Sequence, residues 1–567
     1  MSTPLPSDLD IANAATLRPM SEVAAQLGLT EQYLEPWGRD VAKIDLAVLD
    51  EPAQRHPGKY VVVTAITPTP LGEGKTTVAV GLAQGLARLG HRAVVTLRQP
   101  SMGPTFGIKG GAAGGGYSQV VPMDRLNLHL TGDFHAITAA HNLLAAMIDN
   151  HLHHGNALGL DVRNISWRRV LDVNDRSLRN IVVGLGARQD GVVRESGFDI
   201  TAASEVMVLL TLATSMVDLR ERLGRIVVGY TTSGQSVTAD DLHAGGAMAA
   251  LLIDALKPNL LQTLEGGPAI VHCGPFGNIA TGTSSITADL IGLQRSDYVV
   301  TEAGFGSDMG AERFFDVKCR VGGLRPDAVV LVATVRSLKA HSGRYVIRAG
   351  KPLPDDLLTE NPADVEAGLP NLRAHIGIVR RFGVEPIVAI NAFAEDHASE
   401  HAVIEKLAAD LGVRCAITRH VAGGGAGAER LAEVVAEAAE QENDFDYLYP
   451  LDLPLTDKIE RIATEVYGAD GIDLSPAAAR GLRDYERLGF GGLPVVIAKT
   501  HLSISSDPSL RGAPTGWRMP VREVRAAVGA GYVYAICGDV RTMPGLPSSP
   551  NAERVDVGPD GEVTGLS

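Results

Sequence analysis

A strand that runs directly into a glycine-rich loop and a helix is the feature that most constrains the fold of this sequence. Residues 59–66 (KYVVVTAI) form a β-branched run, which is typical of a strand buried on both faces. Apolar residues recur at helical spacing over residues 78–89, and residues 92–97 begin a second apolar run. Strand, helix and strand at these lengths predict a βαβ unit and therefore a parallel sheet.

The loop between the first strand and the helix has the pattern of a phosphate-binding loop. Its end matches the Walker A motif, although Thr69 stands where the first glycine of that motif falls. Glycines let backbone N–H groups turn toward phosphate oxygens, Lys75 could reach the β- and γ-phosphates, and Thr76 could bind Mg²⁺. The alternative, a Gly/Pro turn that only joins two elements, is disfavoured because the loop lies between a buried strand and an amphipathic helix. The predicted nucleotide-binding residues are Thr69, Pro70, Leu71, Gly72, Glu73, Gly74, Lys75 and Thr76.

A second glycine-rich segment, residues 98–116, begins with Arg98 directly after the second strand. Parallel α/β sheets bind ligands at the carboxyl ends of their strands, so we expect Arg98 beside the phosphate loop. An arginine there can stabilise the charge of a transferred phosphoryl group. The alternative is a surface loop in which Arg98 pairs with a carboxylate.

Residues 127–135 (NLHLTGDFH) place two histidines and one aspartate close together. His129, Asp133 and His135 could be metal ligands, acid–base groups or polar contacts, and a structural Asp–His pair is the alternative. Without a cysteine pair or an HExxH helix, zinc is not predicted. The catalytic candidates are therefore Lys75, Arg98, His129 and Asp133.

Residues 298–306 (YVVTEAGFG) predict another buried strand that ends in a glycine-rich turn. Phe305, held between glycines, is predicted to be an exposed aromatic ring over a cleft, and its alternative is core packing. Glu302 could lie near the metal or could be an ordinary turn residue.

The remaining pattern predicts an α/β protein of three units. Apolar strand runs occur at residues 180–185, 225–228, 328–334, 386–390 and 413–417, and helical patterns cover 203–219, 247–256, 403–411 and 459–466. We predict a large P-loop-type domain with a doubly wound parallel sheet over residues 1–340. Two smaller α/β domains are predicted over residues 341–445 and 446–567.

The charge balance and the termini of this sequence exclude several classes of protein. The chain has 51 basic and 66 acidic side chains and a net charge of −15, which argues against nucleic acid or an anionic membrane as the main partner. Four cysteines without a CxxC pair fit a reducing compartment. No secretory signal and no apolar run long enough for a bilayer is recognised. We therefore expect a soluble cytoplasmic protein.

The phosphate loop, the Arg98 segment and the stretch NLHLTGDFHAIT, in this order, closely resemble the formate–tetrahydrofolate ligases (formyltetrahydrofolate synthetases). The resemblance continues through ALKPNLLQTLEGGPA, DYVVTEAGFGSDMGAERFFDVKCR and VREVRAAVGAGYVYAICGD. It extends over nearly the whole chain from about residue 10.

This resemblance implies the ATP-dependent ligation of formate to tetrahydrofolate. Formate would attack the γ-phosphate of ATP to give formyl phosphate and ADP, and N10 of tetrahydrofolate would then attack the formyl carbon and release phosphate. The resemblance implies that Lys75 and Mg²⁺ hold the phosphates, that Arg98 holds formyl phosphate, and that Phe305 and Phe393 lie against the pteridine or adenine ring. It also implies a homotetramer that is activated by a monovalent cation.

Several positions depart from the family pattern. Gln99 replaces a glutamate, which removes a charge that attracts cations. Val421 stands where the family usually has a tryptophan, so stacking worth about 1–3 kcal/mol is lost, by analogy with base–aromatic contacts. Thr281 replaces a common histidine, and His501 and Leu502 replace Gln-Tyr. Because these changes lie on the acceptor side, our hypothesis is that formyl phosphate is still formed, whereas tetrahydrofolate binds weakly or is replaced.

Two other functions stay open at this stage. The second-ranked one is a related ATP-dependent ligase with another carboxylate or another acceptor amine. The third is a P-loop nucleotide-switch protein, which predicts ATP hydrolysis that is indifferent to formate. The long glycine-rich loops and the histidine cluster favour a small-molecule pocket and therefore disfavour the switch.

Overall fold

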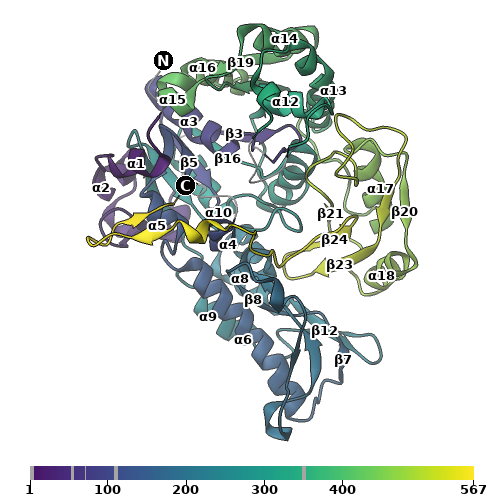
Figure 1. Cartoon of the computed structure of the whole chain (residues 1–567). Helices are drawn as coiled ribbons and strands as arrows, with labels where there is room; N and C mark the ends of the chain where they lie inside the picture. The colour runs from purple at the N-terminus through teal and green to yellow at the C-terminus, as the bar shows by residue number, and fades with distance from the viewer. Residues whose placement is uncertain (1–4, 53–56, 71, 108–112, 348–352, 567) are drawn as a thin grey trace.

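The computed structural model describes residues 5–52, 57–70, 72–107, 113–347 and 353–566. A mostly parallel sheet in the order β1-β2-β14-β15-β4-β16-β3-β17-β18-β19 forms its centre, with β6 paired to β14 and β5 paired to β6 (Figure 1). All neighbouring strands from β15 to β19 run parallel. The predicted α/β class with a large parallel sheet is confirmed. The strand bounds are β1 (Leu34–Pro36), β2 (Ala42–Ile44), β3 (Lys59–Ala65), β4 (Ala93–Leu97), β5 (Gly114–Gly115), β6 (Ser118–Val121), β14 (Asn259–Thr263), β15 (Pro268–Val271), β16 (Tyr298–Glu302), β17 (Ala328–Ala333), β18 (Pro386–Asn391) and β19 (Arg414–Thr418).

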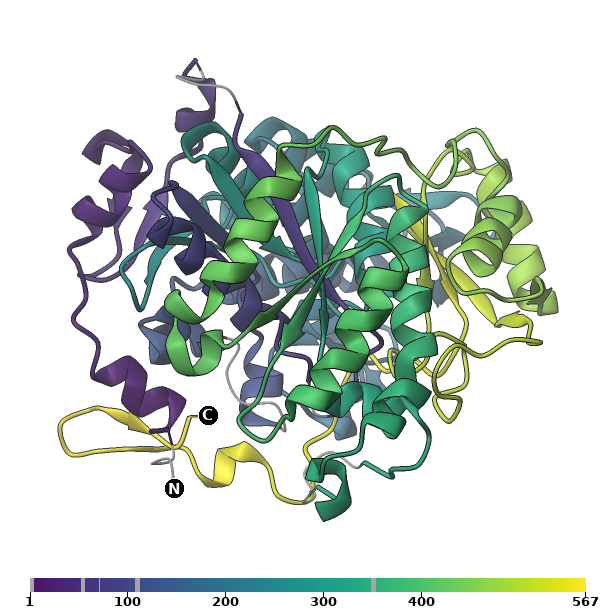
Figure 2. The ribbon, with the colours of Figure 1, turned by 90° about the horizontal axis from the view of Figure 1, so that it is seen from above.

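Strand β3 lies in the interior of this sheet and is buried on both faces. Tyr60 and Val62 join the apolar cluster on one face, and Val61 and Val63 join the cluster on the other. This alternation explains the continuous β-branched run, since successive side chains of a strand point to opposite faces. Figure 2 shows helices on both sides of the fanned strands. The helices packed on the sheet are α3 (Lys75–Arg88), α10 (Ile286–Arg295), α12 (Val335–His341), α13 (Pro362–Arg380), α14 (Ala398–Asp410) and α16 (Glu429–Ala439).

A helical and β-ribbon arm projects from the sheet at the bottom of Figure 1. Its core brings together Leu144, Leu209 and Val228, from three different elements. The predicted helix over 203–219 is two helices, and Ser215 caps the second with its hydroxyl. The arm contains α6 (Asp133–His153), α7 (Glu205–Leu212), α8 (Met216–Gly224), α9 (Gly245–Leu251), β7 (Leu160–Ile165), β8 (Arg169–Leu171), β9 (Ile181–Val183), β10 (Arg194–Ser196), β11 (Phe198–Ile200), β12 (Val227–Thr231) and β13 (Ser236–Thr238).

The prediction of a buried strand over residues 180–185 is correct about the strand and wrong about its burial. The strand β9 exists, but it pairs with β10 in a separate two-stranded ribbon. Val182 is 52% exposed and Leu185 is 68% exposed. A short apolar run therefore indicated the strand correctly, but it could not indicate whether a second layer covers that strand.

The C-terminal part packs beside the sheet and then returns across it. Figure 1 shows its helices and small sheet at the right, and Figures 1 and 2 both place the C-terminus close to α1 (Asp8–Asn13). On the return, the backbone N–H of Asn551 donates to the carbonyl of Gly107 at 2.8 Å. The main elements are α17 (Leu455–Glu465), α18 (Pro476–Arg487), β21 (Val495–Ala498), β23 (Glu523–Ala527), β24 (Tyr532–Ile536), β25 (Asp556–Val557) and β26 (Val563–Thr564).

The central sheet continues past residue 340. Strands β18 and β19, which belong to the predicted unit 341–445, are its outermost parallel strands on one side. The division of the chain at residues 340 and 445 stays a prediction. Among the described residues, no helix combines the length and the apolar character needed to cross a membrane.

Charged side chains are buried where two π-helical segments, η6 (Ser307–Ala311) and η7 (Phe314–Cys319), pass between the sheet and the C-terminal part. Asp308 pairs with Lys499 at 3.0 Å, and both side chains are buried. Glu312 is also fully buried, and neither of its carboxyl oxygens has a hydrogen-bond partner among the described residues. Burial, with the negative charge of Asp316 nearby, raises the pKa of Glu312 well above its usual value. Burial therefore favours the neutral form of Glu312.

We predict that Glu312→Gln becomes progressively more stable than the wild type as the pH rises. A carboxyl group whose pKa is raised by folding contributes stability below its unfolded pKa of 4.5, and this stability is lost as the pH rises toward the folded pKa. The difference in the free energy of unfolding should therefore grow by about 1.4 kcal/mol per pH unit above that value. Urea unfolding between pH 5 and 8 measures it. The exposed Glu437→Gln is the control, and a difference independent of pH would contradict the prediction.

Candidate active site

The phosphate loop joins the end of β3 to the start of α3 and needs a glycine at its last position. Gly74 caps α3 with a φ of 73°, in the left-handed region. A Cβ atom at Gly74 would lie 2.5 Å from Nδ2 of Asn391. That same Nδ2 donates to the carbonyl of Glu73 at 3.1 Å, and Thr77 Oγ1 donates to the carbonyl of Gly74 at 2.6 Å. The turn into the helix is thus fixed by β18 on one side and by α3 on the other.

The Glu73 carboxylate holds the first half of the loop through hydrogen bonds with Thr69. The backbone N–H of Thr69 donates to Glu73 Oε1 at 2.8 Å, and the Thr69 hydroxyl donates to the same oxygen at 3.1 Å. Glu73 is buried, Pro70 is half-buried, and Gly72 is exposed with a φ of 75°. Leu71, which the sequence also assigned to the nucleotide site, lies outside the described residues.

Lys75 is the first residue of α3 and is half-buried. Its ammonium group makes no hydrogen bond or ion pair within the described part of the chain. Burial lowers the pKa of Lys75, while the nearby carboxylates of Glu73 and Glu302 raise it. A partly desolvated cation at the N-terminus of a helix, with no direct partner among the residues that the structure describes, is well placed to meet an anionic ligand.

Glu302, at the carboxyl end of β16, brings the candidate residues of the site together. The Thr76 hydroxyl donates to Glu302 Oε2 at 2.6 Å, and Arg98 Nε donates to Oε1 at 3.3 Å. Strand β16 lies between β4 and β3 and is parallel to both, so the ends of all three strands meet at one edge of the sheet. Arg98 therefore pairs with a carboxylate, which was one part of the alternative interpretation of the sequence. However, this carboxylate lies beside the phosphate loop.

The residues at this edge fit a magnesium ion. Thr76 Oγ1 and the Glu302 carboxylate are adjacent hard oxygen donors, which Mg²⁺ prefers. Within the described ranges, no group of three or more His, Cys, Asp or Glu side chains is placed to hold a metal ion. Mg²⁺ at this edge would therefore depend on ligand oxygens and water in addition to the protein, as is usual for nucleotide-bound Mg²⁺.

Phe305 follows β16 and is held in a strained conformation. Its φ is 59°, which is unusual for a residue with a side chain. The half-buried ring stacks on His501, with ring centroids 4.7 Å apart and an interplanar angle of 24°. Phe393, which follows β18, is half-buried, and the Arg336 guanidinium lies 4.1 Å from its ring centroid. Both rings thus follow strands that end at the same edge of the sheet.

Asp133 and His129 are placed differently from the other candidates. Asp133 forms a buried ion pair with Lys43 at 2.8 Å and accepts from Asn259 Nδ2 at 2.7 Å. His129 is exposed, and its Nδ1 lies 2.7 Å from Nε2 of His135. In the part of the chain that is described, no hydrogen bond or ion pair joins either residue to Lys75 or Arg98. Catalytic roles for His129 and Asp133 stay predictions.

The structure shows the surroundings of three residues that depart from the family pattern, namely Gln99, Thr281 and Val421. Gln99 and Thr281 are buried. Within the described part of the chain, neither the Gln99 amide atoms nor the Thr281 hydroxyl has a hydrogen-bond partner. The carbonyl of Val421 accepts from the backbone N–H of Tyr117 at 2.8 Å. Val421 therefore helps to fix the glycine-rich turn that follows the Arg98 segment.

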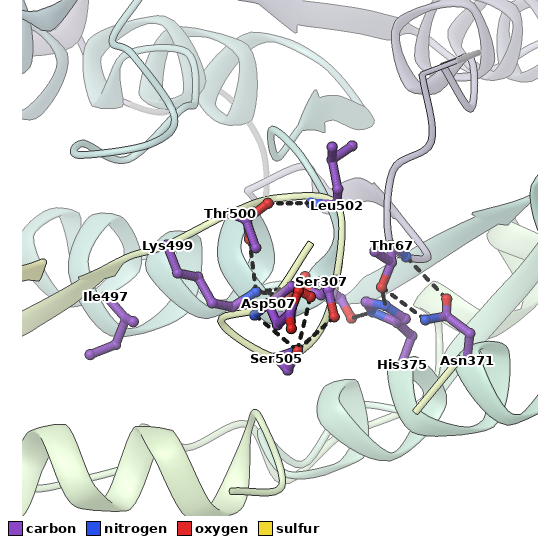
Figure 3. A network of polar contacts seen from close by, with 12 residues as sticks. Thr67, Ser307, Asn371, His375, Ile497, Lys499, Thr500, Leu502, Ser505 and Asp507 are labelled. Atoms are coloured by element: carbon purple, nitrogen blue, oxygen red, sulfur yellow. Dashed lines mark hydrogen bonds and ion pairs between the residues drawn. The ribbon is translucent and has the colours of Figure 1, made fainter. Parts of the chain in front are cut away.

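A buried polar network behind the phosphate loop was not predicted from sequence (Figure 3). Thr67, at the start of the loop, contacts Asn371 and His375 from α13, and His375 also contacts Ser307. No short-range spacing connects these residues, because they lie far apart in the sequence. Only the three-dimensional structure reveals the cluster.

The fold and the site together define a class: an α/β protein with a glycine-rich loop, a lysine and an arginine at the carboxyl edge of a parallel sheet. The family model described as formate–tetrahydrofolate ligase matches residues 6–567, and the chain belongs to this family. The resemblance stated from sequence is confirmed.

Relatives with the same family name cover the whole chain. A formate–tetrahydrofolate ligase of Saccharopolyspora erythraea is 65% identical over 563 residues, which are 99% of this chain and 100% of the relative. One from Cutibacterium acnes is 65% identical over 560 residues, with the same coverage. One from Chloroflexus aggregans is 53% identical over 569 residues and is also covered completely.

We predict that Gly74→Ala destabilises the protein more than Gly72→Ala. Both glycines have a φ near 75°, so alanine costs about 1–2 kcal/mol at either position. A Cβ atom at Gly72 meets no described atom within 4 Å, whereas at Gly74 it must displace the Asn391 amide. Guanidinium unfolding measures both variants. Equal losses of stability would contradict the packing that we describe at Gly74.

Proposed function

We propose that this protein ligates formate to tetrahydrofolate in an ATP-dependent reaction, giving 10-formyltetrahydrofolate, ADP and phosphate through formyl phosphate. The observation that carries the proposal is the grouping of Lys75, Thr76 and Arg98 around Glu302 at the carboxyl edge of the sheet. The proposal agrees with the family to which the chain belongs. Phosphoryl transfer depends mainly on positioning and charge neutralisation, and these residues can supply both.

In the first step a formate oxygen attacks the γ-phosphorus of ATP, the bond to the bridging oxygen breaks, and ADP leaves. The loop N–H groups and the Lys75 ammonium bind the phosphate oxygens. Thr76 and Glu302 would hold Mg²⁺, which neutralises phosphate charge when it is bound. The Arg98 guanidinium stabilises the charge of the mixed anhydride.

In the second step N10 of tetrahydrofolate attacks the formyl carbon, the C–O bond to phosphate breaks, and N10 loses its proton. The aromatic rings of Phe305 and Phe393 offer flat apolar faces for the pteridine or the adenine. Val421 provides no ring at its position, so these two phenylalanines would carry the stacking. A monovalent cation belongs to the proposal as an activator, although Gln99 supplies no carboxylate for it.

The direct test is a phosphate-release assay with ATP, Mg²⁺ and formate, with and without tetrahydrofolate. We expect 10-formyltetrahydrofolate to accumulate in step with ADP only when all three substrates are present. Equal phosphate release without tetrahydrofolate would support a ligase with another acceptor. ATP hydrolysis that is indifferent to formate would support the nucleotide-switch alternative.

We predict that Lys75→Met lowers kcat/KM for ATP by about a hundredfold or more, because a single charge that stabilises the transition state is lost. The variant should fold normally, since the Lys75 ammonium makes no ion pair within the described residues. Steady-state kinetics and thermal unfolding measure the two effects. A kcat/KM within threefold of the wild type would contradict the proposed role of Lys75.

We also propose a cytoplasmic homotetramer. What supports assembly is a set of exposed apolar side chains on the β9–β10 ribbon of the arm, where Val182, Leu185 and Val193 are 52%, 68% and 58% exposed. We expect sedimentation velocity to give four times the chain mass of 59.7 kDa. A monomer at micromolar concentration would contradict this part of the proposal.

A further inference from the structure

Every polar group of Thr67, at the start of the phosphate loop, is bonded to a helix side chain, and Figure 3 shows the contacts with Asn371 and His375. Its N–H donates to Asn371 Oδ1 at 3.2 Å, and its carbonyl lies 2.9 Å from His341 Nε2. Its hydroxyl accepts from Asn371 Nδ2 at 2.9 Å and lies 2.8 Å from His375 Nε2. Asn371 and His375 belong to α13 and His341 belongs to α12, so these two helices fix the position where the loop begins.

The other ring nitrogen of His375 holds the Phe305 turn. His375 Nδ1 lies 2.7 Å from the hydroxyl of Ser307, two residues after Phe305. The backbone between them is tightly packed, because a Cβ atom at Gly306 would lie 3.1 Å from the His375 ring and 3.2 Å from the carbonyl of Ile66. His375 is therefore a direct bridge between the loops that follow β3 and β16.

His375 is suited to this bridge because it is neutral. It is fully buried, and burial lowers its pKa to about 4. A neutral imidazole has one donor and one acceptor, and the hydroxyls of Thr67 and Ser307 can each take either role. The ring therefore satisfies both hydroxyls without placing a charge behind the phosphate loop.

The ring that stacks on Phe305 is attached to the same segment. Lys499 pairs with Asp308 at 3.0 Å and donates to the carbonyls of Thr500 at 3.0 Å and Ser503 at 2.6 Å. These bonds shape the turn that carries His501 to its stack with Phe305. Both halves of the Phe305–His501 pair are thus anchored at residues 307–308, and those residues are anchored to the phosphate loop through His375.

We propose that His375 is a positioning residue for the ligation, which sets the Phe305–His501 pair at a fixed distance from the phosphate loop. The inference rests on the proposed function, in which formyl phosphate forms at the loop, and of the two rings considered there it takes the acceptor pteridine to be the one that lies against Phe305. The two reacting groups bind to different loops, so their separation depends on what joins those loops. A misplacement of about 1 Å can cost about a hundredfold in rate.

The test compares two variants that each keep one half of the bridge. In His375→Asn the side-chain amide lies near the position of Nδ1 and can reach Ser307, whereas in His375→Gln it lies near Nε2 and can reach Thr67. The matched control is His141→Gln. His141 is also buried, with a pKa lowered to about 3, and its ring nitrogens contact the Ser204 hydroxyl at 2.8 Å and the Arg168 carbonyl at 2.9 Å. It lies in the arm, on α6.

We expect both His375 variants to lower kcat by about tenfold to a hundredfold, because each breaks one side of the bridge. The KM for ATP should change less than threefold, since Lys75 and the loop backbone remain. The KM for tetrahydrofolate should rise at least fivefold. His141→Gln should lower the unfolding temperature by about as much as the two His375 variants do. It should leave kcat, the KM for ATP and the KM for tetrahydrofolate within twofold of the wild type.

A double-mutant cycle with Ser307→Ala identifies the link itself. If Ser307 acts through His375, the double variant Ser307→Ala/His375→Gln should lose no more than twofold in kcat beyond His375→Gln alone. If the losses in kcat caused by Ser307→Ala and His375→Gln multiply in the double variant, the proposal is wrong. It is also wrong if the His375 variants have the same kinetic constants as His141→Gln. If the wild type itself forms no 10-formyltetrahydrofolate, the proposed function is wrong. If the wild type is active and the His375 variants are equally active, only the role of His375 is wrong.

Discussion

The Glu302 carboxylate accepts a hydrogen bond from Thr76 on one oxygen and from Arg98 on the other, and the arrangement of the site depends on this shared acceptor. Thr76 belongs to the helix after β3, and Arg98 follows β4. Because β16 lies between these two strands and is parallel to both, Glu302 reaches each neighbour without a long loop. The parallel register is therefore what converts three distant stretches of sequence into one cationic edge with a single central carboxylate.

Buried charges tie the sheet to the parts of the chain that flank it. The pairs Asp308–Lys499, Lys318–Asp289 and Lys43–Asp133 are almost fully removed from solvent. Burial of one member without its partner would be strongly destabilising, so each pair favours a single relative placement of its two segments. Glu312 is buried nearby with no hydrogen-bond partner for its carboxyl group in the described ranges, and its raised pKa favours the protonated form.

Local pattern and chemistry predicted much of this structure from the sequence. The β-branched run before the phosphate loop became β3, and the apolar runs over 328–334, 386–390 and 413–417 became β17, β18 and β19. Strands β14 and β15 were not predicted, because Asn259, Gln262 and Pro268 interrupt their apolar pattern. Of the candidate site, the sequence predicted that Arg98 lies beside the phosphate loop, but the contacts of Thr76 and Arg98 with Glu302 depend on a strand order that the sequence did not predict. The bridge through His375 was not predicted either, because Thr67 and His375 are 308 positions apart and no periodicity relates them.

The hydrogen bond from Asn551 to Gly107 ties the segment after Arg98 to a residue that is synthesised much later. This contact cannot form until residue 551 has emerged from the ribosomal exit tunnel. Gly107 therefore gains this contact only after residue 551 has been synthesised, long after Gly107 itself has left the ribosome.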